Sequence, residues 1–446
     1  MAKRRKNKTN PIFVVFASVV SLVLGFAIVY LYFNSYFTVT VSFSLEEPVR
    51  SVGLNEEFVL SDIKCKIKGI DYSDNVSVEY YSLDGSKINK IDTSLETTYV
   101  IKYTLDMDGY YLVTEQLVHV VSMEDLEINF LMTGNKYSGD CIYIKAGDTD
   151  ILIDAGSKKN SFPTIKSYLD GTDGTEHAYV EDGVIEYVIA THAHQDHIAA
   201  FPDGVFVEYE IETIIDFPKT DSTSNLTAEY KEVVNTLVAS GTKHYTALEC
   251  YNNENGAQRV YELAAGIEME ILYNYYYENS ASDENDYSVC VLISRGEDKY
   301  LLTGDLEAEG EEKLVEHYKD TDTLKDVYLF KAGHHGSYSS TSTSLLSLTS
   351  PEVVVCTCVA FTDEYTDDPN NMFPSVQMIN NMIAADVKHF YVTQMASSNE
   401  AGWEAANGNI VCYANASGKG IKGSNSSADF FDTTIFLIFG EYRNWR

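Results

Sequence analysis

Metal-ligating side chains crowd together at the end of a predicted buried strand, and this feature constrains the fold more than any other. The apolar run VIEYVIA, residues 184–190, is typical of a strand and is followed by a threonine. Three of the chain's ten histidines and one carboxylate come directly after it: His192, His194, Asp196 and His197. Imidazole and carboxylate groups together suit Zn²⁺ and, less selectively, Fe or Mn. Because neighbouring side chains in a turn point in different directions, this spacing predicts two metal ions side by side.

Two later strand ends carry residues of the same chemical types. A predicted strand ending in YLLTGD delivers Asp305, and another ending in YLFKAGHHGS delivers His334 and His335. Active sites on open α/β sheets are assembled where the carboxyl ends of several strands meet. We therefore expect these residues to join the first cluster, with the Asp305 carboxylate bridging two cations.

The pattern after the first forty residues predicts two domains. Residues 37–121 read as short strands that alternate polar and apolar residues, with Asp-Gly turns, which predicts a small all-β sandwich. This segment resembles bacterial immunoglobulin-like surface modules and indicates a spacer or a contact for a partner of unknown class. In residues 127–446 strands and helices alternate, which predicts an α/β domain.

The order of the ligand motifs resembles that of the metallo-β-lactamase superfamily. H-x-H-x-D-H is preceded by DILIDAG and followed by a Gly-Asp strand end and a later strand-end histidine. Within the superfamily, three segments are most similar to the hydrolase domain of the bacterial DNA-uptake competence protein (ComEC-type): GDCIYI, DYSVCVLISRGEDKYLLTGDLEAEGEEKL and LFKAGHHGSYSSTSTSLL. The resemblance covers residues 128–413. It implies a four-layered αββα sandwich, the metallo-β-lactamase fold, with a dinuclear metal site at one edge.

The resemblance also implies a role for each residue of the site. His192 and His194 would hold the first metal. The second metal would be held by Asp196, His197 and His334, and Asp305 would bridge the two. Asp154 in LIDAG would be a carboxylate that orients a ligand or a water molecule. Three further side chains would face the substrate or support the site: Lys331, His335 and Ser337.

The third ligand of the first metal is the open question. Many members of the superfamily carry one more histidine between the H-x-H-x-D-H motif and the bridging aspartate. Only His244 lies in that interval, and its context, SGTKHYTAL, is not the usual strand end. Asp216, which ends the segment ETIID, is an alternative. The ComEC-type branch often lacks this ligand, so the resemblance implies that the first metal is weakly held.

The amino terminus predicts a membrane anchor. Residues 1–10 carry five basic residues and no acid, and residues 11–33 form a charge-free run long enough for a transmembrane helix. A cleaved signal peptide would have a shorter apolar core and a small-residue exit, whereas this run ends in bulky aromatic residues. The basic tail is expected to stay in the cytoplasm. The prediction is therefore a single-pass protein of the cell membrane with its folded domains outside the cytoplasm.

The net charge limits the choice of partners. The chain carries a formal net charge of −35, and such a field repels polyanions. Nucleic acid is therefore a disfavoured partner unless its binding is local. Three lysines offer either a local basic patch beside the metals or ordinary surface charges: Lys158, Lys159 and Lys331.

The predicted site indicates a hydrolase. Two neighbouring cations lower the pKa of a shared water molecule, hold the resulting hydroxide and neutralise charge on a developing oxyanion. The first hypothesis is a phosphodiesterase or nuclease in which Asp196 or Asp305 relays the proton. A small molecule with a lactone or a phosphorylcholine-type envelope ester is the alternative substrate. An anchored adhesion protein with a vestigial site is the alternative of another class.

Overall fold

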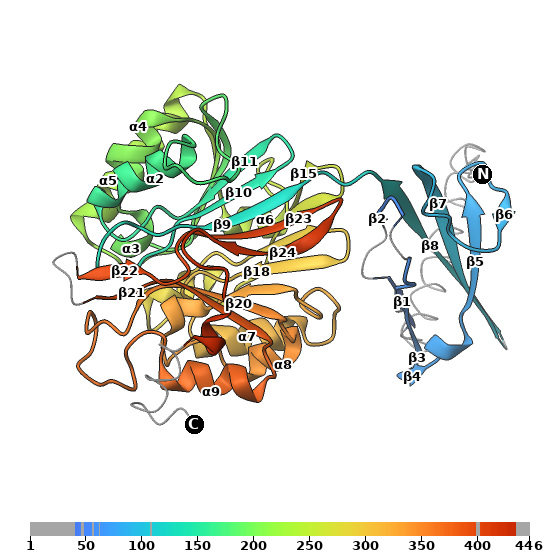
Figure 1. Cartoon of the computed structure of the whole chain (residues 1–446). Coiled ribbons are helices and arrows are strands. Elements are labelled where there is room, and N and C mark those ends of the chain that lie inside the picture. Colours follow the sequence, from blue (N-terminus) through green and yellow to red (C-terminus); the bar gives the residue numbers. More distant parts are fainter. Residues whose placement is uncertain are drawn as a thin grey trace, which may run out of the picture. The chain divides into compact units, whose positions relative to one another are not determined.

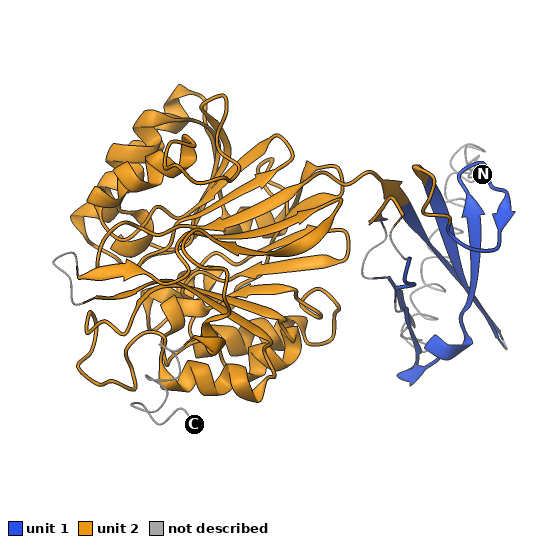
Figure 2. Cartoon of the chain, viewed as in Figure 1, with its two compact units in different colours: residues 1–50, 58–91, 98–118 blue, residues 51–57, 92–97, 119–446 orange. Residues whose placement is uncertain are grey.

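The computed structural model describes residues 41–45, 49–55, 58–61, 63–107, 109–397 and 402–433. The chain forms two compact units, which Figure 2 colours separately. The first comprises residues 1–50, 58–91 and 98–118, and the second comprises residues 51–57, 92–97 and 119–446. The predicted basic tail and membrane anchor, residues 1–33, lie outside the described residues. Within the described ranges, no helix has the length and apolar character that crossing a bilayer requires.

The amino-terminal part of the described chain consists of strands and one short helical turn, η1 (Ser73–Asn75). Alternate side chains of strand β7 are buried, as expected of a strand with one packed face: Tyr99, Ile101, Tyr103 and Leu105. The strands form a sheet of order β1 (Val41–Ser44), β3 (Lys64–Ile67), β4 (Ile70–Asp71), and a sheet of order β2 (Val49–Gly53), β8 (Tyr110–Val121), β7 (Thr97–Met107), β5 (Ser77–Ser82), β6 (Lys87–Ile88). The likeness to an immunoglobulin-like module stays a prediction.

Two eight-stranded sheets form the frame of the second unit (Figure 1). The order of the first sheet is β14 (Lys243–Thr246), β13 (Glu210–Asp216), β12 (Val184–Ala190), β11 (Thr149–Ile153), β10 (Ile142–Ala146), β9 (Leu126–Phe130), β23 (Ile410–Asn415), β24 (Gly418–Gly423). The order of the second sheet is β15 (Val260–Ala264), β16 (Ile267–Ile271), β17 (Val291–Arg295), β18 (Asp298–Leu302), β19 (Leu329–Lys331), β20 (Val353–Ala360), β21 (His389–Ala396), β22 (Trp403–Ala405).

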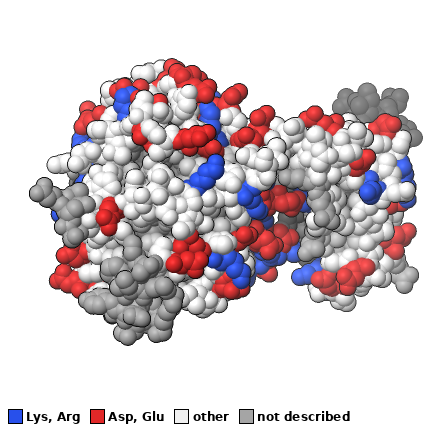
Figure 3. All heavy atoms as spheres, viewed as in Figure 1, with Lys and Arg blue, Asp and Glu red and all other residues white. Residues whose placement is uncertain are grey.

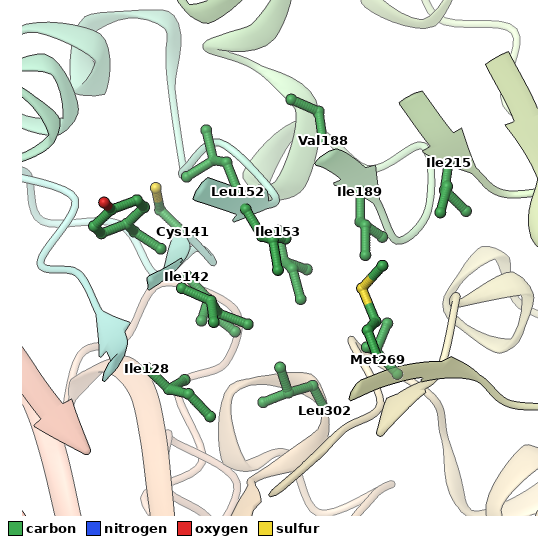
Figure 4. Close-up of a cluster of buried hydrophobic side chains, with 14 of the residues drawn as sticks. Ile128, Cys141, Ile142, Leu152, Ile153, Val188, Ile189, Ile215, Met269 and Leu302 are labelled. Carbon is green, nitrogen blue, oxygen red and sulfur yellow. The ribbon is translucent and has the colours of Figure 1, made fainter. Parts of the chain in front are cut away.

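The main apolar core lies between these two sheets. Figure 4 shows side chains of both sheets that meet there, all of them buried: Ile142, Ile153 and Ile189 from the first sheet, and Met269 and Leu302 from the second. Strand β16 illustrates the pattern, because its apolar residues are buried at every second position while glutamates alternate with them. Removal of this apolar surface from water is the main contribution to the stability of the unit.

Helices cover the outer faces of both sheets. Buried residues of α2 (Phe162–Leu169) and α5 (Asn225–Ser240) belong to the same core cluster as the first sheet. Those of α7 (Ala308–Tyr318), α8 (Thr343–Thr349) and α9 (Val376–Ala384) pack in a second cluster with the outward side chains of the second sheet. Shorter helical segments connect the layers: α3 (Gln195–Ile198), α4 (Phe206–Glu208), α6 (Ala247–Asn252), η2 (Lys159–Ser161), η3 (Phe201–Val205), η4 (Tyr275–Tyr277), η5 (Glu284–Tyr287), η6 (Gly333–Gly336) and η7 (Phe430–Asp432). The predicted mixed α/β fold is confirmed as an αββα sandwich.

Parallel strands in each sheet position the predicted ligands. Strands β11 to β14 run parallel to one another in the first sheet, as do β18 to β21 in the second. The segments that follow β11, β12, β18 and β19 carry Asp154 and every metal ligand that the resemblance implies. Carboxyl ends of parallel strands are where open α/β sheets place their ligands.

Candidate metal centre

Four ligand-type side chains converge from three strand ends. Asp196 and His197 follow β12, Asp305 follows β18 and His335 follows β19, and one ligand atom of each lies within 4.8 Å of the others. His197 Nε2 lies 2.9 Å from Asp305 Oδ2, and His335 Nε2 lies 3.3 Å from the same oxygen. His335 Nε2 also lies 3.5 Å from Asp196 Oδ2. Two imidazoles and two carboxylates are a donor set for a divalent cation.

His192 and His194 form a second pair of donors beside this cluster. His192 Nε2 lies 3.1 Å from His194 Nδ1, so the two nitrogens point to one place. On its other side, His192 Nδ1 lies 3.1 Å from the Thr191 hydroxyl. Burial, followed by the neighbouring His197, lowers the pKa of His192 well below its ordinary value. A neutral imidazole is the form that binds a metal.

Carboxylates and carbonyls hold the ligand rings. His197 Nδ1 donates to Asp154 Oδ2 at 2.7 Å, and Asp154 also accepts from the backbone N–H and the hydroxyl of Thr191, both at 2.8 Å. His335 Nδ1 donates to the carbonyl of Thr357 at 2.9 Å. In each histidine the bond at Nδ1 leaves Nε2 facing the cluster. Such outer bonds fix the ring orientation and raise the basicity of the ligating nitrogen.

The electrostatics of the cluster favour a cation. Burial alone would lower the pKa of His197, but the Asp305 and Asp154 carboxylates raise it well above its ordinary value. The pKa of His335 is raised in the same way by Asp305 and Asp140, against burial. A field that retains protons on two buried histidines also attracts metal ions.

Buried polar atoms without a hydrogen-bond partner indicate whether a metal ion fits the cluster. Within the described part of the chain, Asp305 Oδ1 and His335 Nε2 are buried and have no hydrogen-bond partner. A buried polar atom without a partner costs about 1–3 kcal/mol. Both atoms belong to the four-residue cluster, and a coordinated cation would satisfy both. The residues therefore fit a metal centre.

A buried ion pair that the sequence did not indicate lies behind the cluster. Lys331 Nζ lies 2.7 Å from Asp140 Oδ2, and neither side chain has meaningful contact with solvent. Asp140 also lies 3.3 Å from His335 Nδ1 and accepts a hydrogen bond from the Thr357 hydroxyl. Burial would raise the pKa of Asp140, but Lys331 and His335 lower it to about 2. The only sequence signal was an acid directly before the fully apolar strand segment CIYI, where a charge needs a buried partner.

The structure brings His335, the neighbour of the predicted ligand His334, into the four-residue cluster. The sequence assigned the ligand role to His334, whose Nδ1 instead lies 3.1 Å from Glu307 Oε1 at the partly exposed side of the loop. His335 is fully buried and supplies the nitrogen near Asp305. The reason is local: both residues have left-handed backbone, with φ of 44° and 51°, and the Thr357 carbonyl fixes the His335 ring. A ligand role for His334 stays a prediction.

The other residues singled out in the sequence lie outside the cluster. Ser337 is buried and its hydroxyl lies 3.0 Å from that of Ser339. His244 lies 3.0 Å from Asp216, and this pair lines a separate cavity of about 620 Å³ beside β13 and β14. Among the described residues, neither His244 nor Asp216 belongs to the converging ligand-type side chains.

The three predicted basic-patch lysines do not gather at the site. Lys331 is buried, and Lys159 pairs on the surface with Asp203 at 2.7 Å and Glu229 at 2.8 Å. Lys158 alone lines the cavity beside the cluster. That cavity has a volume of about 600 Å³ and is lined by Ser138, Ser157, Lys158, His194, Gln195, Asp196, Ser282, Asp283, Glu284, Asn285, His334, Glu364 and Tyr365.

Comparison with known proteins supports a family for part of the chain. Residues 134–205, which include Asp140, Asp154 and the H-x-H-x-D-H motif, match the model of the metallo-beta-lactamase superfamily. Recombination protein 2 of Haemophilus influenzae is 34% identical over 90 residues, which are 20% of this chain and 10% of that protein. The chain thus spans about a tenth of the length of this curated relative.

Solved structures give more distant similarities. Igni18, a metallo hydrolase from Ignicoccus hospitalis, is 15% identical with a TM-score of 0.33, covering 60% of this chain and 95% of its own. CmlA, a diiron beta-hydroxylase from Streptomyces venezuelae, is 11% identical with a TM-score of 0.32, covering 62% of this chain and 65% of its own.

Proposed function

We propose that this chain, which contains a metallo-β-lactamase superfamily domain, is a hydrolase of phosphodiester bonds that uses two divalent metal ions. The observation that carries the proposal is the convergence of Asp196, His197, Asp305 and His335, two of which have buried atoms without a partner. Zn²⁺ is the metal that imidazole and carboxylate donors favour, and Mn²⁺ or Fe suits the same set. His192 and His194 would complete the first position, with Asp305 between the two.

The chemistry of the proposed reaction divides between the metals and the chain. Two bound divalent cations would activate a water molecule and neutralise charge that develops on the substrate oxygen. Asp154 holds the His197 ring, and the Thr357 carbonyl holds the His335 ring. These contacts keep the donor atoms in place without rearrangement during turnover.

Asp196 is the candidate for proton movement. It is partly exposed, it lines the cavity, and its Oδ2 accepts a hydrogen bond from the Tyr365 hydroxyl at 3.1 Å. A carboxylate in the cavity wall can take a proton from the attacking water or give one to the leaving group. Asp305 is fully buried, so a structural role between the metals suits it better.

A small phosphodiester suits the cavity better than nucleic acid does. Acidic side chains are spread over the visible face of the molecule, and lysines and arginines are fewer (Figure 3). The cavity itself carries several carboxylates and a single lysine, Lys158. Both the acidic surface and the acidic cavity would repel a polyanionic strand.

Metal content and hydrolysis of bis-nitrophenyl phosphate, measured together on the full chain, test the proposal. We expect about two metal equivalents per chain and a turnover that chelation abolishes. The double variant His192→Ala, His194→Ala should lose metal and activity, whereas His389→Ala, which changes a half-exposed histidine on β21, should lose neither. Hydrolysis of a lactone panel without phosphodiesterase activity would point to a different ester substrate. Less than one equivalent of metal and no hydrolysis would favour a vestigial site.

We also propose that residues 11–33 anchor the chain in the cell membrane with the metal centre outside the cytoplasm. The support is the uncharged run itself and the five basic residues before it. Resistance of the full chain to carbonate extraction, with cleavage by protease added to intact cells, is the expected result. A chain released by carbonate would contradict the anchor without affecting the hydrolase proposal.

A further inference from the structure

We propose that the rim of the cavity beside the candidate metal centre binds a positively charged ammonium group of the substrate. The inference rests on the proposed hydrolase function and names the substrate class: a phosphodiester or related ester that carries an ammonium group near the bond to be cleaved. The surface concerned is the acidic rim, defined as Asp283, Glu284 and Glu364, which line the same cavity as Asp196.

The charges on the cavity wall are unbalanced. Besides Asp196, the acidic rim contributes three carboxylates, and Lys158 is the one lysine or arginine in the lining. The Lys158 ammonium lies 4.3 Å from the centre of the Tyr137 ring. In the described chain, none of the three rim carboxylates forms an ion pair with a lysine or an arginine.

Backbone groups hold the acidic rim in place. Asp283 Oδ1 accepts from the N–H of Asn285 at 3.0 Å, and Glu284 Oε2 accepts from the N–H of Asp221 at 2.9 Å. Glu364 Oε2 accepts from the N–H of Ser138 at 2.7 Å. These bonds position the carboxylates and leave their charge uncompensated. Glu284 Oε1 is also buried and has no hydrogen-bond partner among the described residues.

Asn285 is an independent sign of a ligand in the same cavity. Its side chain is 3% exposed, and its Nδ2 lies 3.3 Å from Glu307 Oε1 and 3.4 Å from His334 Nδ1. A carboxylate only accepts, so Glu307 fixes the amide with nitrogen on that side. Asn285 Oδ1 is left buried in the described structure without a donor. The wall of the cavity therefore offers acceptors that need a donor or a cation.

An aromatic ring completes the environment for an ammonium group. Tyr365 is 56% exposed and lines the cavity, and its hydroxyl is held by Asp196. Ring faces attract ammonium groups, most strongly where carboxylates lie nearby and water is partly excluded. A substrate with an anionic phosphoryl group at the metals and an ammonium group at the acidic rim matches the side chains that line the cavity.

A matched pair of substrates tests the inference on the metal-loaded full chain. The first is nitrophenyl phosphorylcholine, and the second is its isostere without the ammonium charge, nitrophenyl dimethylbutyl phosphate, in which carbon replaces the quaternary nitrogen. We expect kcat/KM to be at least roughly tenfold higher for the substrate that carries the ammonium group, through a lower KM. The double variant Asp283→Asn, Glu284→Gln should reduce this ratio to below about two. The control Glu210→Gln, Glu262→Gln removes two exposed acids that do not line the cavity and should leave the ratio unchanged.

Equal kcat/KM for the two substrates in the unmodified chain would overturn the inference and leave the hydrolase proposal standing. If neither substrate is hydrolysed, titration calorimetry with phosphorylcholine and dimethylbutyl phosphate decides the matter. Preferential binding of phosphorylcholine that Asp283→Asn weakens would then support the acidic rim while the proposed function fails. Should the double variant not fold, the single variant Asp283→Asn serves in both measurements, because that side chain is exposed.

Discussion

The ammonium of Lys331 lies 2.7 Å from Asp140 Oδ2 in a fully buried ion pair behind the candidate metal centre. A buried pair is expensive to break, because removal of one partner leaves a charge without compensation. We expect Lys331→Met to lower the free energy of unfolding by about 3–5 kcal/mol, measured by urea denaturation. Lys319→Met, which removes an exposed partner of Glu316, should cost at most about 1 kcal/mol.

The double variant Asp140→Asn, Lys331→Met distinguishes a charge effect from a packing effect. It removes both charges, so it should recover a substantial part of the stability that Lys331→Met loses. If the double variant loses as much unfolding free energy as the two single variants lose together, the two charges do not stabilise each other.

The bond between His197 and Asp154 predicts an effect on metal affinity. Asp154→Asn weakens the acceptor of His197 Nδ1–H and places an amide where three donors now converge. Loss of such an outer bond typically reduces metal affinity by about 10- to 100-fold. Competition with a chromogenic chelator measures the change in the full chain. Asp182→Asn is the control, since that carboxylate accepts from the Val184 N–H at the far end of β12. An affinity within twofold of the unmodified chain would contradict the role given to Asp154.

Glu311 predicts a pH dependence of stability. Its buried carboxylate accepts from the N–H groups of Thr341 and Ser342, both at 2.7 Å, and so fixes the loop that follows His335. Burial raises the pKa of Glu311 from 4.5 to about 7. Because the folded chain binds this proton more tightly than the unfolded chain, the contribution is fully present below about pH 4.5 and is lost as the pH rises through about 7.

Glu311→Gln removes this titration. Between pH 5 and pH 8 the unmodified chain should lose about 2–3 kcal/mol of unfolding free energy that the variant does not lose. Glu312→Gln, at the exposed neighbouring position, should follow the unmodified chain. Parallel stability curves for the unmodified chain and Glu311→Gln would refute the prediction.

The sequence was informative where the signal is local. The H-x-H-x-D-H motif directly follows a strand, and Asp305 directly follows another, so their positions at the sheet edge follow from the alternation of strands and helices. Asp140 is different, because its partner Thr357 is 217 residues away in the chain. The return of β23 to pair with β9 is likewise a long-range event that no local pattern indicates.

The neighbouring histidines His334 and His335 show a second limit of prediction from the sequence. Adjacent residues of one type are equivalent in a motif, and their backbone angles decide which one points to the cluster of ligand-type side chains. Both histidines have left-handed φ values, and the residues that their rings contact, Glu307 and Thr357, lie outside the motif.

Separate replacement of the two histidines decides which one is the ligand. His335→Ala removes the nitrogen 3.3 Å from Asp305 Oδ2 and should lower the metal content by about one equivalent, with a large loss of turnover. His334→Ala removes a ring that contacts Glu307 and lines the cavity, so the metal content should be unchanged while KM rises. The measurement is elemental analysis of both dialysed proteins beside their KM and kcat. Loss of metal in His334→Ala together with full retention in His335→Ala would restore the ligand assignment made from the sequence.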